Sequence, residues 1–300
     1  MDLEKQLNNT YGLIDPTCTN LHMPTNDVIE VTTANGHYAL KLYNSASRTP
    51  VEVQWEIDLT LHLSNNNVPV VRPISGKEGY VFSFTFENNT RTGVLFAWVE
   101  GEKPEPELTT YTLLGEVAAR IHTAADTFET TVSREKYDSN ELIDDQIRRI
   151  KASLEECGQY RRFSDLCERM RKIITNPRLD YGIIHNDLTL DNVHLTGNLL
   201  TVFDLDSSGE SWRAAEPWRV LRASEDYFAA WLTGYRSIRD FSEEDEKAVA
   251  VFAIVEDIRN VVWKLGYAKS SRGKPLLQTK DLPYVIDQWL EWEQTKIVSI

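Results

Sequence analysis

Three polar side chains in one stretch of the sequence could together carry out phosphoryl transfer. Asp187, Asn192 and Asp204 follow one another in a segment that begins at His185. Phosphoryl transfer from ATP needs one carboxylate to orient and deprotonate a hydroxyl, and an amide and a second carboxylate to hold magnesium on the phosphates. The three residues fill these roles in this order, so we predict Asp187 as the base and Asn192 and Asp204 as metal ligands. We expect His185 to support this loop by hydrogen bonding.

The sequence between Asn192 and Asp204 predicts a β-hairpin. One short strand over residues 193–195 is followed by a turn at residues 196–198 that contains a glycine, and a second strand runs over residues 199–203. Because a hairpin brings its two ends together, Asn192 and Asp204 should face one ion.

A calcium-binding loop is the competing interpretation of the same carboxylates. Asp204 and Asp206, followed by serine and glycine, imitate the start of an EF-hand loop. That loop needs a bidentate glutamate at its twelfth position, and the twelfth residue here is Ala215. The magnesium interpretation is therefore the stronger one.

The composition predicts a globular protein of the cytoplasm. A chain of 300 residues with 41% hydrophobic content can bury a core as one large or two modest domains. We predict no secretory signal and no membrane span, because the N-terminus has no apolar run and the longest such run, residues 248–255, is far below the roughly 20 residues a span needs. The three cysteines, Cys18, Cys157 and Cys167, are too few and too scattered for a disulfide framework or a zinc site.

The net charge of −14 bears on the partners of the protein. A strongly acidic chain repels polyanions, so we expect neither nucleic acid nor an anionic membrane as a partner. The same charge would suit a cationic small molecule as substrate. It could equally serve only solubility, and both interpretations stay open.

The pattern of apolar residues changes from strand-like to helix-like near Gly101. Before this point an Asn35-Gly36 pair predicts a hairpin. The expected strands there cover residues 28–32, 37–43, 80–86 and 92–98, and the expected helices cover residues 3–11 and 51–63. After it, apolar spacings of three and four predict helices over residues 108–121, 142–154, 163–174, 218–233, 243–265 and 282–296.

The motif from His185 to Asn192, with the hydrophobic stretch that leads into Asp204, resembles the catalytic core of the eukaryotic-like kinases. The closest likeness is to the aminoglycoside phosphotransferase and homoserine/choline kinase-like family. Protein kinases usually carry a basic residue where this chain has Thr189, and a long activation segment that is missing here. The resemblance implies an α+β, bilobal protein-kinase-like fold, with a small antiparallel β-sheet N-lobe over residues 1–101 and a mostly helical C-lobe over residues 102–300.

The resemblance also implies ATP, with GTP as the alternative, and Mg²⁺. Lys41 resembles the strand lysine that binds the α- and β-phosphates, and the resemblance calls for a glutamate partner on the following helix. Glu56 is the predicted partner, and Glu52, one turn earlier, is the alternate. A glycine-rich loop before the lysine is missing.

Other nucleotide contacts are implied by position in the family pattern. In place of the glycine-rich loop stands a polar turn in which Asn26 would cap the phosphates. Residues 96–101 resemble the hinge between lobes, where the carbonyl of Ala97 and the amide of Val99 would bind adenine.

The function implied is an O-phosphotransferase for a small, hydroxylated, amine-bearing acceptor. Antibiotic inactivation is the first role considered, followed by a metabolite such as homoserine or choline, then a protein Ser/Thr kinase, then a nucleotide-binding scaffold without turnover. Acidic and aromatic side chains after the hairpin are the candidates to receive the acceptor: Asp206, Glu210, Trp212 and Glu256.

Overall fold

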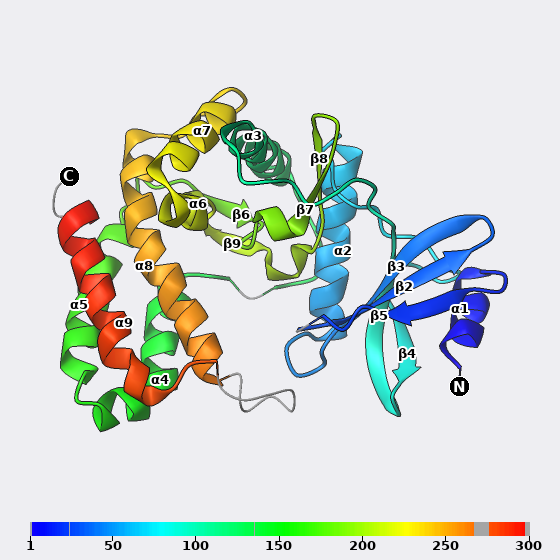
Figure 1. The fold of residues 1–300 in the computed structure, drawn as a ribbon, viewed down its shortest axis with the longest axis horizontal. Coiled ribbons are helices and arrows are strands. Elements are labelled where there is room, and N and C mark those ends of the chain that lie inside the picture. Colours follow the sequence, from blue (N-terminus) through cyan, green and yellow to red (C-terminus); the bar gives the residue numbers. More distant parts are fainter. Residues whose placement is uncertain (1, 24, 135, 267–275, 298–300) are drawn as a thin grey trace. The chain divides into compact units, whose positions relative to one another are not determined.

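The computed structural model describes residues 2–23, 25–134, 136–266 and 276–297. The chain forms two compact units (Figure 1). Unit 1 comprises Met1–Pro106, Thr123–Arg134 and Asp187–Ser208, and unit 2 comprises Glu107–His122, Glu135–Asn186 and Gly209–Ile300. The first change of unit follows Pro106, close to Gly101, but the chain later returns to unit 1 with Asp187 and the hairpin behind it. The predicted division into lobes at Gly101 stays a prediction.

Unit 1 is built on a five-stranded antiparallel sheet in the order β1-β2-β3-β5-β4. The strands are β1 (Thr17–Asn20), β2 (Asp27–Thr33), β3 (Gly36–Leu42), β4 (Phe82–Phe86) and β5 (Asn89–Ala97). The predicted hairpin at Asn35-Gly36 is confirmed, since Thr33 pairs with Gly36 across it. Strand β1 was not predicted, because its sequence is polar and its side chains alternate between exposed and half-buried at the edge of the sheet.

The two faces of this sheet are covered by different helices. Neighbouring residues of a strand point to opposite faces, and on β5 Leu95 packs in one buried cluster while Val94 packs in another. The first cluster includes Leu7 from helix α1 (Leu3–Tyr11), and the second includes Ile57 from helix α2 (Pro50–Asn65). Both helices agree with the predicted ranges. Helix α2 is fixed at its start by a capping box, in which Thr49 and Glu52 exchange hydrogen bonds.

The predicted hairpin after Asn192 is also confirmed, as β7 (Val193–Thr196) and β8 (Leu199–Val202). Its first strand lies against the chain that follows β5, because Glu102 and Leu195 exchange backbone hydrogen bonds of 3.3 and 2.8 Å. Gly101 makes this approach possible. Its φ is +96°, and a β-carbon there would collide with the carbonyl of Leu195 and the hydroxyl of Thr196.

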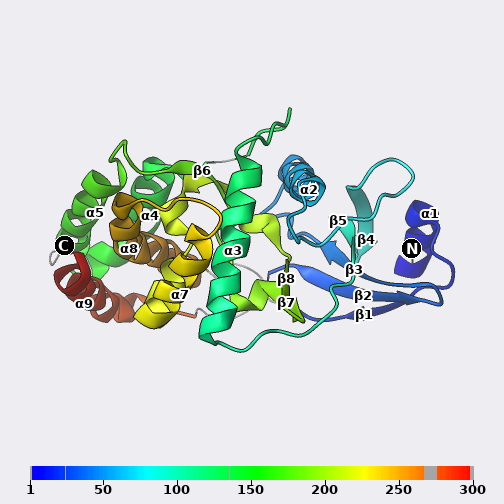
Figure 2. The same cartoon turned by 90° about the horizontal axis from the view of Figure 1, so that it is seen from above.

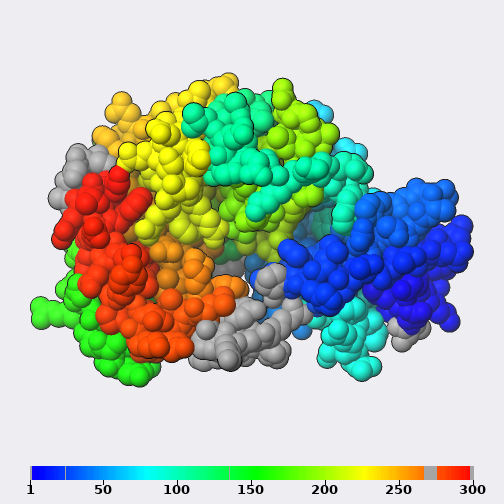
Figure 3. All heavy atoms as spheres, in the orientation of Figure 1, coloured from blue at the N-terminus to red at the C-terminus, as the bar shows by residue number. Residues whose placement is uncertain are grey.

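Unit 2 is mostly helical. Its longer helical elements are α3 (Leu108–Ala125), η1 (Asn140–Asp145), α4 (Gln146–Glu156), α5 (Tyr160–Ile174), α6 (Trp218–Ala223), α7 (Glu225–Arg236), α8 (Glu243–Gly266), α9 (Leu282–Trp292) and η7 (Glu293–Ile297). Of α3, the part up to His122 belongs to this unit. Helix α8 is buried without interruption from Ala248 to Glu256, which shows that other elements surround it on all sides. Figure 3 shows segments of this unit, coloured yellow to red, packed against one another.

Helices α3 and α7 cross closely through two glycines. A β-carbon on Gly115 would collide with the carbonyl of Trp231, and one on Gly234 with the carbonyl of Thr112. Figure 1 and Figure 2 both show the two helices side by side. Any larger residue at either glycine would push them apart.

Two predictions about unit 2 need correction. The single helix expected over residues 218–233 is two helices, because Ser224 is extended (φ −167°, ψ 142°) and caps α7 through a hydrogen bond from the Asp226 amide. The strand pair β6 (Tyr181–Ile184) and β9 (Gly209–Trp212) was missed. Each strand is only four residues long, and its partner lies too far along the chain for a turn signal to reveal it.

Two further observations concern the cysteines and the lengths of the apolar helices. Cys18, Cys157 and Cys167 are all free thiols. Within the part of the chain that the structure describes, no helix is both long and apolar enough to cross a bilayer.

Candidate active site

Lys41 on β3 stands at the centre of a cluster of carboxylates in unit 1. Its Nζ lies 2.6 Å from Asp204 Oδ1, 3.3 Å from Glu56 Oε1 and 3.4 Å from Asp206 Oδ2. The ion pair with Glu56 is the predicted one. The alternate, Glu52, is engaged at the N-terminus of α2 by Thr49 instead.

The pKa values in this cluster follow from burial and charge together. Burial alone would lower the pKa of Lys41, but the carboxylates of Asp204, Asp206 and Glu56 raise it well above its ordinary value. Burial would raise the pKa of Asp206, yet Lys41, Arg48 and a hydrogen bond from Asn26 lower it to about 2. Burial raises the pKa of Glu56, and Lys41 offsets only part of this effect. Lys41 therefore stays charged beside at least one permanent anion.

The predicted base and the predicted metal ligands are linked by short hydrogen bonds. The Nδ2 of Asn192 donates to the carbonyl of Asp187 at 2.8 Å and to its Oδ2 at 2.9 Å. The amide of Phe203 donates to the carbonyl of Asn192 at 3.0 Å, which brings the next residue, Asp204, to the same end of the hairpin. Asp204 has a left-handed backbone (φ 63°, ψ 60°), an uncommon conformation that concentrates at functional sites.

These side chains fit a magnesium ion. Mg²⁺ prefers oxygen ligands and takes few from the protein when nucleotide phosphates supply the rest. Among the described residues, Asn192 Oδ1 and Asp204 Oδ2 receive no hydrogen bond, and the Asp204 side chain is 38% exposed. No group of three His, Cys, Asp or Glu residues in the described ranges could hold a metal alone, so the phosphates would have to complete the coordination.

The predicted phosphate contact, Asn26, lies beside the same cluster. Its Nδ2 donates to Asp206 Oδ2 at 2.8 Å, and its Oδ1 accepts from the amide of Asn44 at 3.1 Å. Asp206, predicted as an acceptor contact, thus lies within the charge cluster around Lys41.

Two arginines that the sequence analysis missed hold the backbone of Asp206. Arg48 donates through Nε and Nη2 to its carbonyl, at 3.1 and 2.7 Å, and Arg134 donates to the same oxygen. Arg134 also lies over the ring of Trp55 on α2. No local pattern marks either arginine, because both contacts join residues far apart in the sequence.

The predicted hinge segment, residues 96–101, begins in the last two residues of β5 and continues beyond the strand. The amides of Ala97 and Trp98 are bound by the carbonyls of Arg72 and His37, at 2.9 and 3.1 Å. The amide of Val99 has no acceptor among the described residues, as an adenine-binding group requires. Its carbonyl lies 3.3 Å from His194 Nδ1.

The start of the catalytic segment is anchored in unit 2 by a glutamate that was also missed. The Oε2 of Glu216 accepts from the amide of His185 at 2.7 Å, and its Oε1 accepts from the amide of Asn186 at 3.0 Å. Behind it, His122 Nε2 lies 3.3 Å away and His122 Nδ1 lies 2.8 Å from the hydroxyl of Tyr235. Burial would raise the pKa of Glu216, but His122 and His185 lower it, and burial lowers the pKa of His122.

The remaining acceptor candidates, all in unit 2, have partners of their own. Glu210 forms an ion pair with Lys136. Trp212 is 9% exposed and packs against Tyr181. Glu256 is 3% exposed, and its Oε2 lies 3.2 Å from Arg259 Nη1. Both glutamates are therefore in ion pairs among the described residues, although Oε1 of Glu256 accepts no hydrogen bond there. Contact of the three residues with an acceptor stays a prediction.

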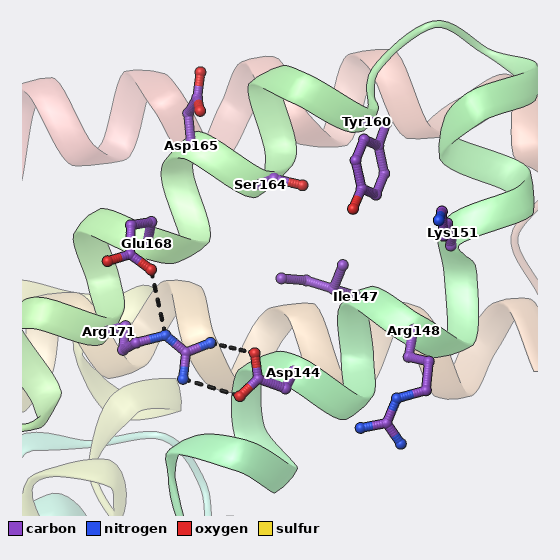
Figure 4. Close-up of a pocket in the computed structure, with 9 residues that line it drawn as sticks. All are labelled: Asp144, Ile147, Arg148, Lys151, Tyr160, Ser164, Asp165, Glu168 and Arg171. Atoms are coloured by element: carbon purple, nitrogen blue, oxygen red, sulfur yellow. Dashed lines mark hydrogen bonds and ion pairs between the residues drawn. The ribbon is translucent and has the colours of Figure 1, made fainter.

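A cleft of about 470 Å³ opens between α4 and α5 and contains none of the predicted site residues (Figure 4). Its charged groups largely neutralise one another: Arg171 binds Asp144 at 3.0 Å and lies 3.4 Å from Glu168. The cleft offers no arrangement for phosphoryl transfer.

Comparison with known proteins identifies the family of the chain. The model of a family described as the phosphotransferase enzyme family matches residues 24–248, which is most of the sequence. The chain belongs to the phosphotransferase enzyme family. It is thus a small-molecule kinase, as the motif around Asp187 predicted. A homoserine kinase of Methylobacillus glycogenes is 24% identical over 276 residues, covering 87% of this chain and 82% of that protein.

Solved structures of other kinases have a fold similar to that of this chain. An amicoumacin kinase in complex with AMP-PNP and Ca²⁺ matches with a TM-score of 0.74 at 16% identity, covering 98% of this chain and 93% of that one. A microcompartment-associated aminopropanol kinase matches with a TM-score of 0.73 at 20% identity, covering 96% and 94% of the two chains. These likenesses confirm the predicted protein-kinase-like fold.

Proposed function

We propose that this phosphotransferase moves the γ-phosphoryl group of ATP to a hydroxyl of a small, amine-bearing molecule, with Mg²⁺ as cofactor. The observation that supports the proposal lies in unit 1, where the Nζ of Lys41 lies within 3.3 Å of carboxylate oxygens of both Glu56 and Asp204. In the same unit Asn192 donates a hydrogen bond to the carboxylate of Asp187. An intact set of this kind argues against a scaffold without turnover.

In the proposed reaction Asp187 accepts the proton of the acceptor hydroxyl as its oxygen attacks the γ-phosphorus. The bond between the γ-phosphorus and the oxygen bridging to the β-phosphate breaks, and ADP leaves. Lys41 binds the α- and β-phosphates and is oriented by Glu56. Magnesium, held by Asn192 and Asp204, would neutralise charge on the phosphates. Val99 and Ala97 would bind the base through their backbone.

The acceptor is proposed to be a metabolite of the amino-alcohol or hydroxy-amino-acid class. The relatives whose sequences align along much of this chain include a homoserine kinase, whereas the amicoumacin kinase is similar in fold at only 16% identity. Antibiotic inactivation, the first role considered from the sequence, therefore becomes the second candidate. The ion pairs of Glu210 and Glu256 also weaken the argument that excess acidity alone selects a cation.

The test is a screen of ADP release with Mg·ATP and two acceptor panels, one of amino alcohols and hydroxy amino acids and one of hydroxylated aminoglycoside antibiotics. We expect a phosphorylated product, identified by mass and by its ³¹P resonance, from the first panel. Asp187→Asn is the control for contaminating kinases. Product from the second panel alone would reverse the order of the two roles. If neither panel is phosphorylated while Mg·ATP binds, the proposed acceptor class is wrong.

A further inference from the structure

Asn186, the residue directly before the proposed base, has a strained backbone. Its φ is +67°, in the left-handed region that only glycine adopts freely and that asparagine tolerates better than most residues. Its amide donates to Glu216. Its side chain, oriented so that the oxygen faces α8, accepts from both Nη1 and Nη2 of Arg259 at 3.0 Å. A fork of two hydrogen bonds fixes the plane of the amide as well as its position.

Arg259 is itself held in place from two other directions. Its Nη1 lies 3.2 Å from Oε2 of Glu256, one turn earlier on α8, and its guanidinium lies 4.6 Å from the centre of the Tyr137 ring. Glu256 is almost fully buried. The guanidinium is thus held in a fixed orientation by contacts other than the one with Asn186, and this orientation determines where the Asn186 amide can lie.

We propose that Arg259 is a positioning residue of the kinase, which clamps Asn186 in its left-handed conformation and so sets the direction in which the chain enters Asp187. The inference rests on the proposed role of Asp187 as the base. It assigns a role in catalysis to α8, through a side chain that acts on Asp187 by way of Asn186.

The physical reason is the cost of the conformation. A left-handed backbone is strained for a residue that carries a β-carbon, although less for asparagine than for most, so without the fork Asn186 would relax toward negative φ. That rotation turns the next peptide and displaces the Asp187 carboxylate. A displacement of about 1 Å in a catalytic group can lower the rate on the order of a hundredfold.

The experiment compares one substitution in two backgrounds. Arg259→Lys keeps the positive charge beside Glu256 but loses the planar fork. In the natural chain we expect it to lower kcat about 10- to 100-fold, with the KM for ATP changed less than about twofold because the nucleotide contacts are untouched. In a chain carrying Asn186→Gly, which adopts positive φ without help, the same substitution should change kcat by less than about twofold.

Arg222→Lys is the matched control, because Arg222 on α6 pairs with Asp257 on α8 at 3.2 Å and should give no such dependence on residue 186. Equal losses in both backgrounds would mean that Arg259 acts through the fold, and the inference would be overturned. An unchanged kcat in the natural chain would overturn it as well.

A second readout separates this inference from the proposed function. Urea unfolding of the natural chain, the two single variants and the double variant measures whether Arg259 and residue 186 interact at all. Additive shifts of the unfolding midpoint would refute the clamp even if catalysis were affected. If no acceptor is ever phosphorylated, the proposed function is wrong. Non-additive midpoints would then show that Arg259 and residue 186 interact in the fold, and the role of Arg259 in catalysis would be overturned.

Discussion

Each unit of the chain holds one cluster of charged side chains at its own part of the catalytic segment, and the two clusters are completed in different ways. In unit 1 the carboxylate of Asp204 faces Lys41 with one oxygen and is 38% exposed, and its other oxygen has no donor among the described residues. In unit 2 the carboxylate of Glu216 is 1% exposed, and both of its oxygens accept backbone hydrogen bonds. Buried polar groups are normally satisfied, as those of Glu216 are, whereas the exposed Asp204 oxygen stays open to a ligand.

The difference indicates that the cluster in unit 1 binds ligands, whereas the cluster in unit 2 supports the fold. The open oxygens of the Lys41 cluster are ready for an ion and for phosphates, so substitutions there should change catalysis and leave folding nearly intact. The closed cluster around Glu216 has nothing left to offer a ligand, so substitutions there should change stability first. Each of the following predictions tests one side of this comparison.

The largest effect is expected for Asp187→Asn. Asparagine can still accept the hydrogen bond from Asn192, so folding and ATP binding should be preserved. Loss of the base should lower kcat about 10²–10⁴-fold. The measurements are steady-state kinetics with the identified acceptor and thermal unfolding. A variant that kept more than about half the rate would show that another group takes the proton.

Asp204→Ala should come next, acting on magnesium-dependent nucleotide binding. Substituting a group that only supports a metal ligand typically costs about 10–100-fold in metal affinity, so loss of a ligand should cost at least about tenfold. Calorimetry with ATP, with and without magnesium, measures this. Asp191→Ala, which removes an exposed carboxylate paired with Lys103, is the control. An unchanged affinity for Mg·ATP would move the metal to Asp206.

Glu216→Gln should act on stability. Glutamine offers one acceptor oxygen where His185 and Asn186 together need two, which leaves one buried N–H facing an amide group. The expected loss is about 1–3 kcal/mol in the free energy of unfolding, measured in urea. The control, Glu225→Gln, alters an exposed ion pair with Lys296 and should leave the midpoint in place. Equal stability of both variants would mean that Glu216 does not anchor the segment.

The smallest effect concerns pH and His122. Burial lowers its pKa in the folded protein. Below about pH 6.5, the ordinary pKa of histidine, His122 therefore binds a proton in the unfolded chain but not in the folded chain. Stability should therefore fall as the pH drops from 7.5 to 5.5, by at most about 1.4 kcal/mol per pH unit from this group. In His122→Gln this part of the slope should disappear. Identical slopes in the two proteins would show that His122 is not held neutral.

Much of unit 1 could be predicted because its signals are local. The Asn35-Gly36 turn, the apolar spacing of α2 and the glycine turn of the β7–β8 hairpin each lie within a few residues of the structure that they specify. The offsets from Asp187 to Asn192 and from the hairpin to Asp204 are equally local. These features needed no knowledge of distant residues.

The features that were missed depend on partners far along the chain. Arg134 meets Asp206 across 72 residues, and Glu216 meets His185 across 31. Strands β6 and β9 are four residues each and stable only as a pair. Ser224 divides α6 from α7 through a serine cap, inside an apolar pattern that fits one helix equally well. Tertiary contacts decided the cases of the arginine, the glutamate and the strand pair, and the sequence near those residues does not encode them, whereas the cap at Ser224 is local and was overlooked.

The exchange of hydrogen bonds between Glu102 and Leu195 has a consequence for local unfolding. It joins the segment proposed to bind the base to the hairpin proposed to carry the metal, together with the contact of Val99 and His194. Segments joined in this way tend to open as one cooperative unit. Amide protons of the hinge and of β7 should therefore exchange with solvent at similar rates, and a nucleotide bound at either end would slow exchange at both.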